Sequence, residues 1–144
     1  MSEKMLWPLP PRFHKVTSPF GSRIHPIKKE KAFHSGVDIA CDQGTAIRAP
    51  FDGEVVKIWM DYKNGGGLSM KIEGEGIEIG FCHLSKLEIG QGEEFERGEV
   101  IAYSGGTPRT YGAGKSTGPH LHMTCRMDGH LVDPLTAIEW GDWF

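Results

Sequence analysis

Glycine is the residue that most constrains the fold of this chain. It occupies 20 of 144 positions, about twice its ordinary share of roughly 7%, and 9 prolines accompany it. Glycine destabilises helix interiors and suits tight turns, while proline interrupts helices and sheet ladders. The composition therefore argues against a helical bundle. A chain of this length forms one ordinary domain, so we expect short strands joined by tight turns around a single core.

Apolar and polar residues alternate with a period of two in several short segments, which predicts strands. Residues 121–127 and 130–132 flank Asp128-Gly129, the dipeptide that a type I′ hairpin turn favours. The other alternating segments lie between glycine-rich turns and cover residues 51–60, 68–72 and 77–84.

Helical signal is weak. The best segment begins at Pro134, a residue suited to a first helical turn, and runs to about Trp140. We therefore expect a mostly β fold: a single antiparallel β-sandwich or barrel-like domain with long glycine-rich loops and little helix. Within it, residues 1–17 are expected to be a leader packed on the domain, which itself covers residues 18–144.

Charge and hydrophobicity narrow the classes of partner. Sixteen basic and nineteen acidic residues give a net charge of −3, and no basic stripe follows a phosphate backbone, so we expect no nucleic-acid partner. The apolar runs fall far short of the roughly 20 residues that span a bilayer, so we expect no membrane span. Residues 1–17 show no secretory signal, which predicts synthesis in the cytoplasm without a signal peptide.

The three cysteines, Cys41, Cys82 and Cys125, are odd in number and widely spaced. This pattern suits neither a disulfide framework nor a four-thiolate zinc site. We expect buried thiols in a reducing compartment. Cys82 precedes His83, but neighbours on a strand face opposite sides, which argues against a cysteine nucleophile with a histidine base.

Histidines gather in three short segments around His34, His83 and His120-Leu-His122. On a strand, residues two or four apart share a face, so His34 with Asp38, and His120 with His122, can each point to one side. Imidazole and carboxylate ligands without thiolate suit zinc, and three protein ligands that leave a fourth position open are typical of a catalytic site. The pattern thus predicts a catalytic zinc centre.

The most specific motifs are His34-Ser-Gly-Val-Asp38 and Ser116-Thr-Gly-Pro-His120-Leu-His122, accompanied by Phe20-Gly-Ser-Arg23 and His83-Leu84-Ser85. With these motifs in this order, roughly residues 18–135 resemble the lysostaphin-like zinc metallopeptidases, peptidase family M23. The resemblance implies a lysostaphin-type β fold, one zinc ion, and an endopeptidase that cuts peptide stems or cross-bridges of bacterial peptidoglycan.

The resemblance also implies roles for individual residues. His34, Asp38 and His122 would be the zinc ligands, and His83 and His120 the catalytic pair, with the choice of general base between the two left open. Arg23, in the family-like Gly-Ser-Arg segment, is the expected substrate contact. The bond that is cut, in a glycine bridge or a diaminopimelate cross-link, also stays open.

The sequence leaves room for other functions. The main alternative is a degenerate family member that binds the cell wall or activates another hydrolase. Gly112-Ala-Gly-Lys-Ser116 lacks the full phosphate-loop pattern, and a carrier domain would not need three clustered ligands. A lone domain without a signal resembles a phage lysin, released through a holin or carried in a tail; we expect a monomer that acts on the cell wall.

Some glycines are expected to serve the site itself. Gly36, Gly118 and the pair Gly105-Gly106 lie beside the predicted ligands and would let loop backbone pass close to the metal. Gly65, Gly66 and Gly67 are expected only to form a turn, with no role in the site. The only asparagine, Asn64, precedes that run, and we expect no asparagine to block the fourth zinc position as it does in latent members of the family.

Overall fold

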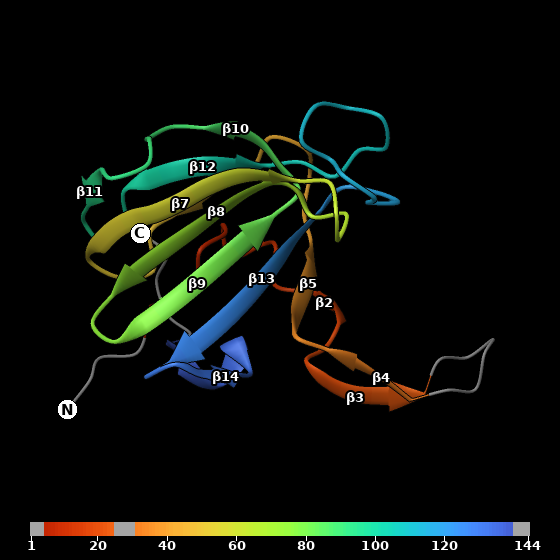
Figure 1. Cartoon of the computed structure of the whole chain (residues 1–144), viewed down its shortest axis with the longest axis horizontal. Helices are drawn as coiled ribbons and strands as arrows, with labels where there is room; N and C mark the ends of the chain where they lie inside the picture. Colours follow the sequence, from red (N-terminus) through yellow and green to blue (C-terminus); the bar gives the residue numbers. More distant parts are fainter. Residues whose placement is uncertain (1–4, 25–30, 140–144) are drawn as a thin grey trace.

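The computed structural model describes residues 5–24 and 31–139; for 22–24, 31, 32 and 139 it describes the backbone alone. The described part is built almost entirely of strands (Figure 1). They are β1 Met5–Leu6, β2 Val16–Ser18, β3 Gly21–Ile24, β4 Lys31–His34, β5 Gly36–Ala40, β6 Ala46–Arg48, β7 Gly53–Asp61, β8 Gly67–Gly74, β9 Ile77–Cys82, β10 Leu84–Leu87, β11 Glu94–Phe95, β12 Val100–Ser104, β13 His120–Met127, β14 His130–Val132 and β15 Ile138–Glu139.

The largest sheet is antiparallel, with strand order β11-β7-β8-β9-β13-β5-β2 and β14 paired to β13. A three-stranded antiparallel sheet, β10-β12-β6, lies beside it. Ile47 of β6 and Ile101 of β12 share one buried cluster with Val55 and Ile79 of the large sheet. The predicted mostly β, antiparallel fold with a core between sheets is confirmed.

Period-two alternation decides which face of each strand meets the core. In β13, Leu121, Met123 and Cys125 are fully buried, while His120 and His122 between them are only partly buried on the opposite face. β9 follows the same pattern, with Phe81 inside and Cys82 on the other side. Polar and histidine side chains therefore gather on one face of adjoining strands.

The predicted hairpin is confirmed, since β13 and β14 pair through Asp128 and Gly129, whose φ angles of 51° and 83° are those of a type I′ turn. The strand expected over residues 77–84 is interrupted at His83, where φ is 59°, and β10 then joins the second sheet.

The helix expected from Pro134 to about Trp140 was wrong. A single 3₁₀ turn covers Pro134–Ala137, capped by Asp133, whose side chain accepts a hydrogen bond from the Leu135 N–H at 3.0 Å. Ile138 is extended and buried, and β15 pairs in parallel with β1. Burial and strand pairing thus override the local helical signal; Trp140 lies outside the described residues. No helix in the described part of the chain is long and apolar enough to cross a membrane.

Residues 5–9 belong to the same core. Met5, Trp7 and Leu9 are buried within the main apolar cluster. The Arg48 N–H donates to the Pro8 carbonyl at 2.8 Å, and the Leu6 N–H donates to the Pro50 carbonyl at 2.9 Å. Packing and backbone hydrogen bonds therefore join this segment to the rest of the fold.

Gly36 lies where β5 and β13 approach each other closely, so a substitution at Gly36 tests the pairing of these two strands. A Cβ at Gly36 would overlap the backbone oxygen of Met123, whereas a Cβ at Gly118 would meet nothing within 4 Å. We predict that Gly36→Ala lowers the free energy of unfolding by about 1–3 kcal/mol, because β5 and β13 must separate. The control Gly118→Ala changes it by less than about 0.5 kcal/mol. Denaturant unfolding measures both; equal effects would contradict this packing.

Candidate metal centre and active site

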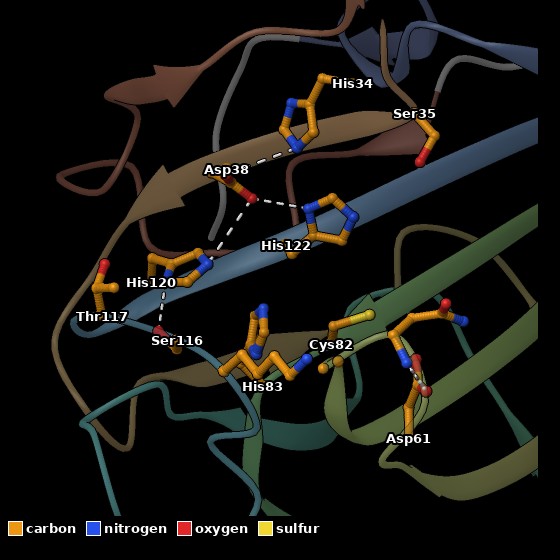
Figure 2. A pocket seen from close by; sticks show the side chains of 14 residues that line it. His34, Ser35, Asp38, Asp61, Cys82, His83, Ser116, Thr117, His120 and His122 are labelled. Carbon is orange, nitrogen blue, oxygen red and sulfur yellow. Dashed lines mark hydrogen bonds and ion pairs between the residues drawn. The ribbon is translucent and has the colours of Figure 1, made fainter. Parts of the chain in front are cut away.

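Three adjacent strands bring the predicted site residues together. β13 lies between β5 and β9, and in this register His122 stands opposite Asp38 on one side and Cys82 on the other. His34 ends β4, two residues before β5 begins. Figure 2 shows Asp38 with His34, His122 and His120 directed towards it. The structure thus assembles residues that are up to 88 positions apart in the sequence.

His34, Asp38 and His122 form the one group among the described residues whose ligand atoms could hold a metal ion. Their nitrogen and oxygen atoms all lie within 4.8 Å of one another. Nε2 of His34 is 3.6 Å from Oδ2 of Asp38, and Nδ1 of His122 is 2.7 Å from Oδ1. Ligands about 2.1 Å from a tetrahedral zinc stand about 3.4 Å apart, so this donor set fits the ion.

Second contacts fix which nitrogen of His34 faces the centre. Its Nδ1 is 3.0 Å from the Pro19 carbonyl. Because a carbonyl only accepts, Nδ1 carries the proton, and the neutral ring leaves the Nε2 lone pair free to bind a metal. The loop before β3 therefore orients a ligand at the end of β4.

Asp38 is surrounded by imidazoles. Its burial raises the pKa of the carboxyl, but the hydrogen bond with His122 and the positive charges that His122, His120 and His34 can carry outweigh burial and hold the pKa below its ordinary value. Asp38 is thus an anion at neutral pH. A carboxylate in this place reduces the net positive charge of a zinc centre.

His120 and His83 form a second pair beside the ligand group. Nδ1 of His120 lies 2.9 Å from the Gly118 carbonyl, and Nδ1 of His83 lies 2.8 Å from the Ala113 carbonyl. The two ring centroids are 4.7 Å apart. Each ring therefore donates its Nδ1–H to backbone and leaves Nε2 free, and His120 presents its Nε2 at 3.8 Å from Oδ1 of Asp38. Such nitrogens can accept or deliver a proton.

The backbone at His83 is held as firmly as its ring. Its φ of 59° lies in the left-handed region that few side chains adopt. The His83 N–H donates to the Gly66 carbonyl at 2.7 Å, and a Cβ at Gly105 would lie 2.7 Å from the His83 oxygen. Strained backbone of this kind is retained where the surroundings over-determine it, typically at functional sites.

An open cavity of about 540 Å³ holds these residues. The loop after β7 and the segment before β13 form its other walls. Its lining residues are His34, Ser35, Asp38, Asp61, Asn64, Gly65, Gly66, Cys82, His83, Lys115, Ser116, Thr117, His120 and His122. All five predicted metal and catalytic residues thus share one cavity. Arg23 lies in β3 opposite Ala32, but its side chain is outside the described residues.

The glycine expectations need correction at two places. The run 65–67 is not plain turn chemistry: Gly65 and Gly66 line the cavity, and a Cβ at Gly67, where φ is 67°, would overlap the Gly112 oxygen. Gly118, by contrast, has open space around its α-carbon, and its φ lies outside the left-handed region. Close approach thus explains Gly36, Gly105 and the 65–67 run but not Gly118.

Cys82 differs from its predicted burial, because it is half-buried and lines the cavity. Burial raises the pKa of its thiol, and the charges of Asp61 and Asp38 raise it further against a hydrogen bond with Ser69 that lowers it. A thiol in this state is protonated at neutral pH and is a poor nucleophile. Sequence reasoning missed Asp61 as a wall residue, since it carries no motif.

Comparison with known proteins agrees with this geometry. The sequence model described as peptidase family M23 matches residues 32–134. The chain belongs to peptidase family M23. One relative, a DD-carboxypeptidase/endopeptidase (Mpg) of Neisseria meningitidis, is 38% identical over 126 residues, which is 87% of this chain and 27% of the relative. The chain therefore spans about a quarter of that relative's length.

Solved structures of two peptidases share the fold. A zinc-containing peptidase from Vibrio cholerae superposes with a TM-score of 0.80 at 26% identity, covering 92% of this chain and 40% of that one. The catalytic domain of the antimicrobial peptidase lysostaphin from Staphylococcus simulans gives 0.71 at 27% identity, covering 87% and 91%. The lysostaphin-type fold implied by the resemblance is confirmed.

The environment of His83 predicts its titration. Burial lowers the pKa of the ring, and the charges of His120 and His122 lower it further against the Ala113 hydrogen bond and Asp38, which raise it. Because the folded-state pKa is depressed, the stability that neutral His83 contributes is present above pH 6.5 and is lost as pH falls. In long-range ¹H–¹⁵N NMR of the metal-free protein, we expect the neutral ring protonated at Nδ1 and a midpoint below 6.5. A proton on Nε2 or a higher midpoint would contradict this.

Proposed function

We propose that this chain is a zinc-dependent endopeptidase that hydrolyses peptide bonds of bacterial peptidoglycan. The observation that carries the proposal is the ligand group of His34, Asp38 and His122 in an open cavity, with two further imidazoles beside it. Membership of family M23 supports the same conclusion. So does the relative from Neisseria meningitidis, which is described as a carboxypeptidase and endopeptidase.

His34, Asp38 and His122 would hold one zinc ion through Nε2, a carboxylate oxygen and Nδ1. When bound, zinc supplies Lewis acidity and lowers the pKa of a water molecule towards about 7. The chain's own contribution is orientation: the Pro19 carbonyl turns His34, and the antiparallel register sets His122 opposite Asp38.

His83 and His120 would act as the catalytic pair. Their Nε2 atoms face the cavity while Nδ1–H groups are held by carbonyls, so a neutral ring can take the proton of the attacking water. The partner ring, when protonated, can donate a hydrogen bond to the developing oxyanion. The arrangement supports the pair, and the division of roles between its members stays open.

A degenerate member that only binds the wall or activates another hydrolase is the alternative. Such proteins lack ligands, whereas here the ligand group is complete and opens onto the cavity.

Several expectations from the sequence stay predictions. They are Arg23 as a substrate contact, action at the cell wall, a monomeric state, phage origin and the route out of the cytoplasm. The division into a leader at residues 1–17 and a zinc metallopeptidase catalytic domain at 18–144 stays a prediction too.

Substitutions separate ligands from catalytic residues. We predict that His34→Ala, Asp38→Ala and His122→Ala each lose stoichiometric zinc and peptidoglycan hydrolysis together. His120→Ala keeps the metal and loses about two to four decades in rate, as removal of a positioned acid–base group does. Metal analysis and release of soluble muropeptides measure the two properties.

His83→Asn is the matched variant at the other member of the pair, because asparagine tolerates the left-handed backbone at this position. We expect retained zinc with a similar loss of rate. If His122→Ala kept full zinc occupancy and full hydrolysis, the proposed ligand set would be wrong. A zinc-bound wild-type protein that releases nothing from purified walls would favour the degenerate alternative.

A further inference from the structure

The cavity extends beyond what a metal ion and its water need. Its volume is about 540 Å³, whereas one water occupies about 30 Å³ of liquid. The additional wall comes from the end of β7, the loop that follows it, and Lys115. In Figure 2, Asp61 lies on the side of the cavity away from His34, with Cys82 between it and the imidazoles. This part of the cavity is positioned to serve as a substrate subsite.

Asp61 offers an unpaired carboxylate oxygen to that space. It is half-buried, and its Oδ1 accepts the Asn64 N–H at 2.9 Å. A Cβ placed on Gly66 would lie 2.9 Å from Oδ2 of Asp61 and 3.3 Å from Sγ of Cys82. Oδ2 therefore borders the cleared volume above Gly66. Within the described part of the chain, Asp61 has no cationic partner within 4.0 Å.

Lys115 brings the opposite charge to the same wall. Its N–H donates to the Gly65 carbonyl at 2.9 Å, and a Cβ on Gly65 would lie 2.7 Å from its Cγ and Cδ. The aliphatic stem is thus laid across Gly65, and the side chain is exposed. Among the described residues, Lys115 forms no ion pair either, not even with Asp61.

A carboxylate and an ammonium thus flank two consecutive glycines without pairing with each other. A ligand group that carries both charges can satisfy both side chains at once, and each charge-assisted hydrogen bond in a partly enclosed site is stronger than its exposed equivalent. A glycine bridge has no charged side chain. A lysine side chain has only the ammonium.

We propose that Asp61 and Lys115 form a subsite for an amino-acid zwitterion, the end of a diamino dicarboxylic acid side chain such as that of diaminopimelate. Asp61 accepts hydrogen bonds from the ammonium, and Lys115 donates to the carboxylate. The subsite rests on the proposed function and names its substrate class: stem peptides with diaminopimelate rather than glycine bridges. Gly65 leaves room for the Lys115 stem, and Gly66 leaves room for the Asp61 carboxylate.

Matched substrates test the two charges separately. Cross-linked stem-peptide dimers are prepared with diaminopimelate, with lysine, which lacks the carboxylate, and with diaminopimelate acetylated on its free amine. We expect the wild-type kcat/KM to be at least tenfold higher for the diaminopimelate peptide than for the lysine peptide or the acetylated peptide. Lys115→Met reduces the preference over lysine to below threefold, and Asp61→Asn, which keeps an oxygen for the Asn64 N–H, does the same for the preference over the acetylated peptide.

Two control variants should leave both substrate preferences, over the lysine peptide and over the acetylated peptide, unchanged. Lys63→Met removes an exposed lysine of the loop between β7 and β8 that does not line the cavity. Asp128→Asn removes a carboxylate at a distant hairpin, where asparagine suits the positive φ. A wild-type enzyme without preference, or ratios that stay unchanged in Lys115→Met and Asp61→Asn, would overturn the subsite.

Binding gives a readout that does not depend on hydrolysis. With His120→Ala as background, calorimetry with the uncross-linked diaminopimelate tetrapeptide should show Kd raised at least fivefold by each charge variant. Charge-dependent binding without hydrolysis by the wild type would contradict the proposed function and leave the subsite standing. Hydrolysis by the wild type, with a Kd that neither charge variant changes, would support the proposed function and overturn the subsite.

Discussion

The antiparallel register of β13 between β5 and β9 is the constraint on which the site depends. It places His122 opposite Asp38 and beside Cys82, and the period of two sends Leu121 and Met123 into the core. A slip of one residue would bury the histidines and expose the apolar residues, so burial of one face fixes the register. The same burial of apolar side chains that stabilises the core therefore also holds Asp38 and His122 opposite each other.

A second constraint lies in the loops that meet at the end of these strands. The connection between β7 and β8 and the long connection between β12 and β13 lie at the same end of the sheet (Figure 1). Backbone groups of both hold His83, through Gly66 at its N–H and Ala113 at its ring. Because loops remote in sequence share these hydrogen bonds, the second imidazole is pre-oriented, and two charged side chains are brought to the same wall.

The parts of the structure that local pattern encodes were predictable from the sequence. Alternation marked the strands, Asp128-Gly129 marked the hairpin, and the spacing from His120 to His122 fits one face of β13. His34 and Asp38 do not share a strand, because β4 ends at His34 and Asp38 lies in β5. The helix after Pro134 was not predictable, because pairing of Ile138 with a strand at the other end of the chain decided it. Asp61 carries no motif, and only the contact between its loop and the segment of Lys115 reveals its place in the cavity wall. Nothing in the structure explains why position 118 is a glycine, because a Cβ there would meet nothing within 4 Å.

The most direct test of the strand-assembled metal centre is a crystal structure of the zinc-bound protein. We predict one ion about 2.0–2.2 Å from Nε2 of His34, one carboxylate oxygen of Asp38 and Nδ1 of His122, with the Nε2 atoms of His83 and His120 close to the ion but not bound to it. An ion held instead by His83, His120 or Cys82, with Asp38 outside its coordination sphere, would contradict this assignment.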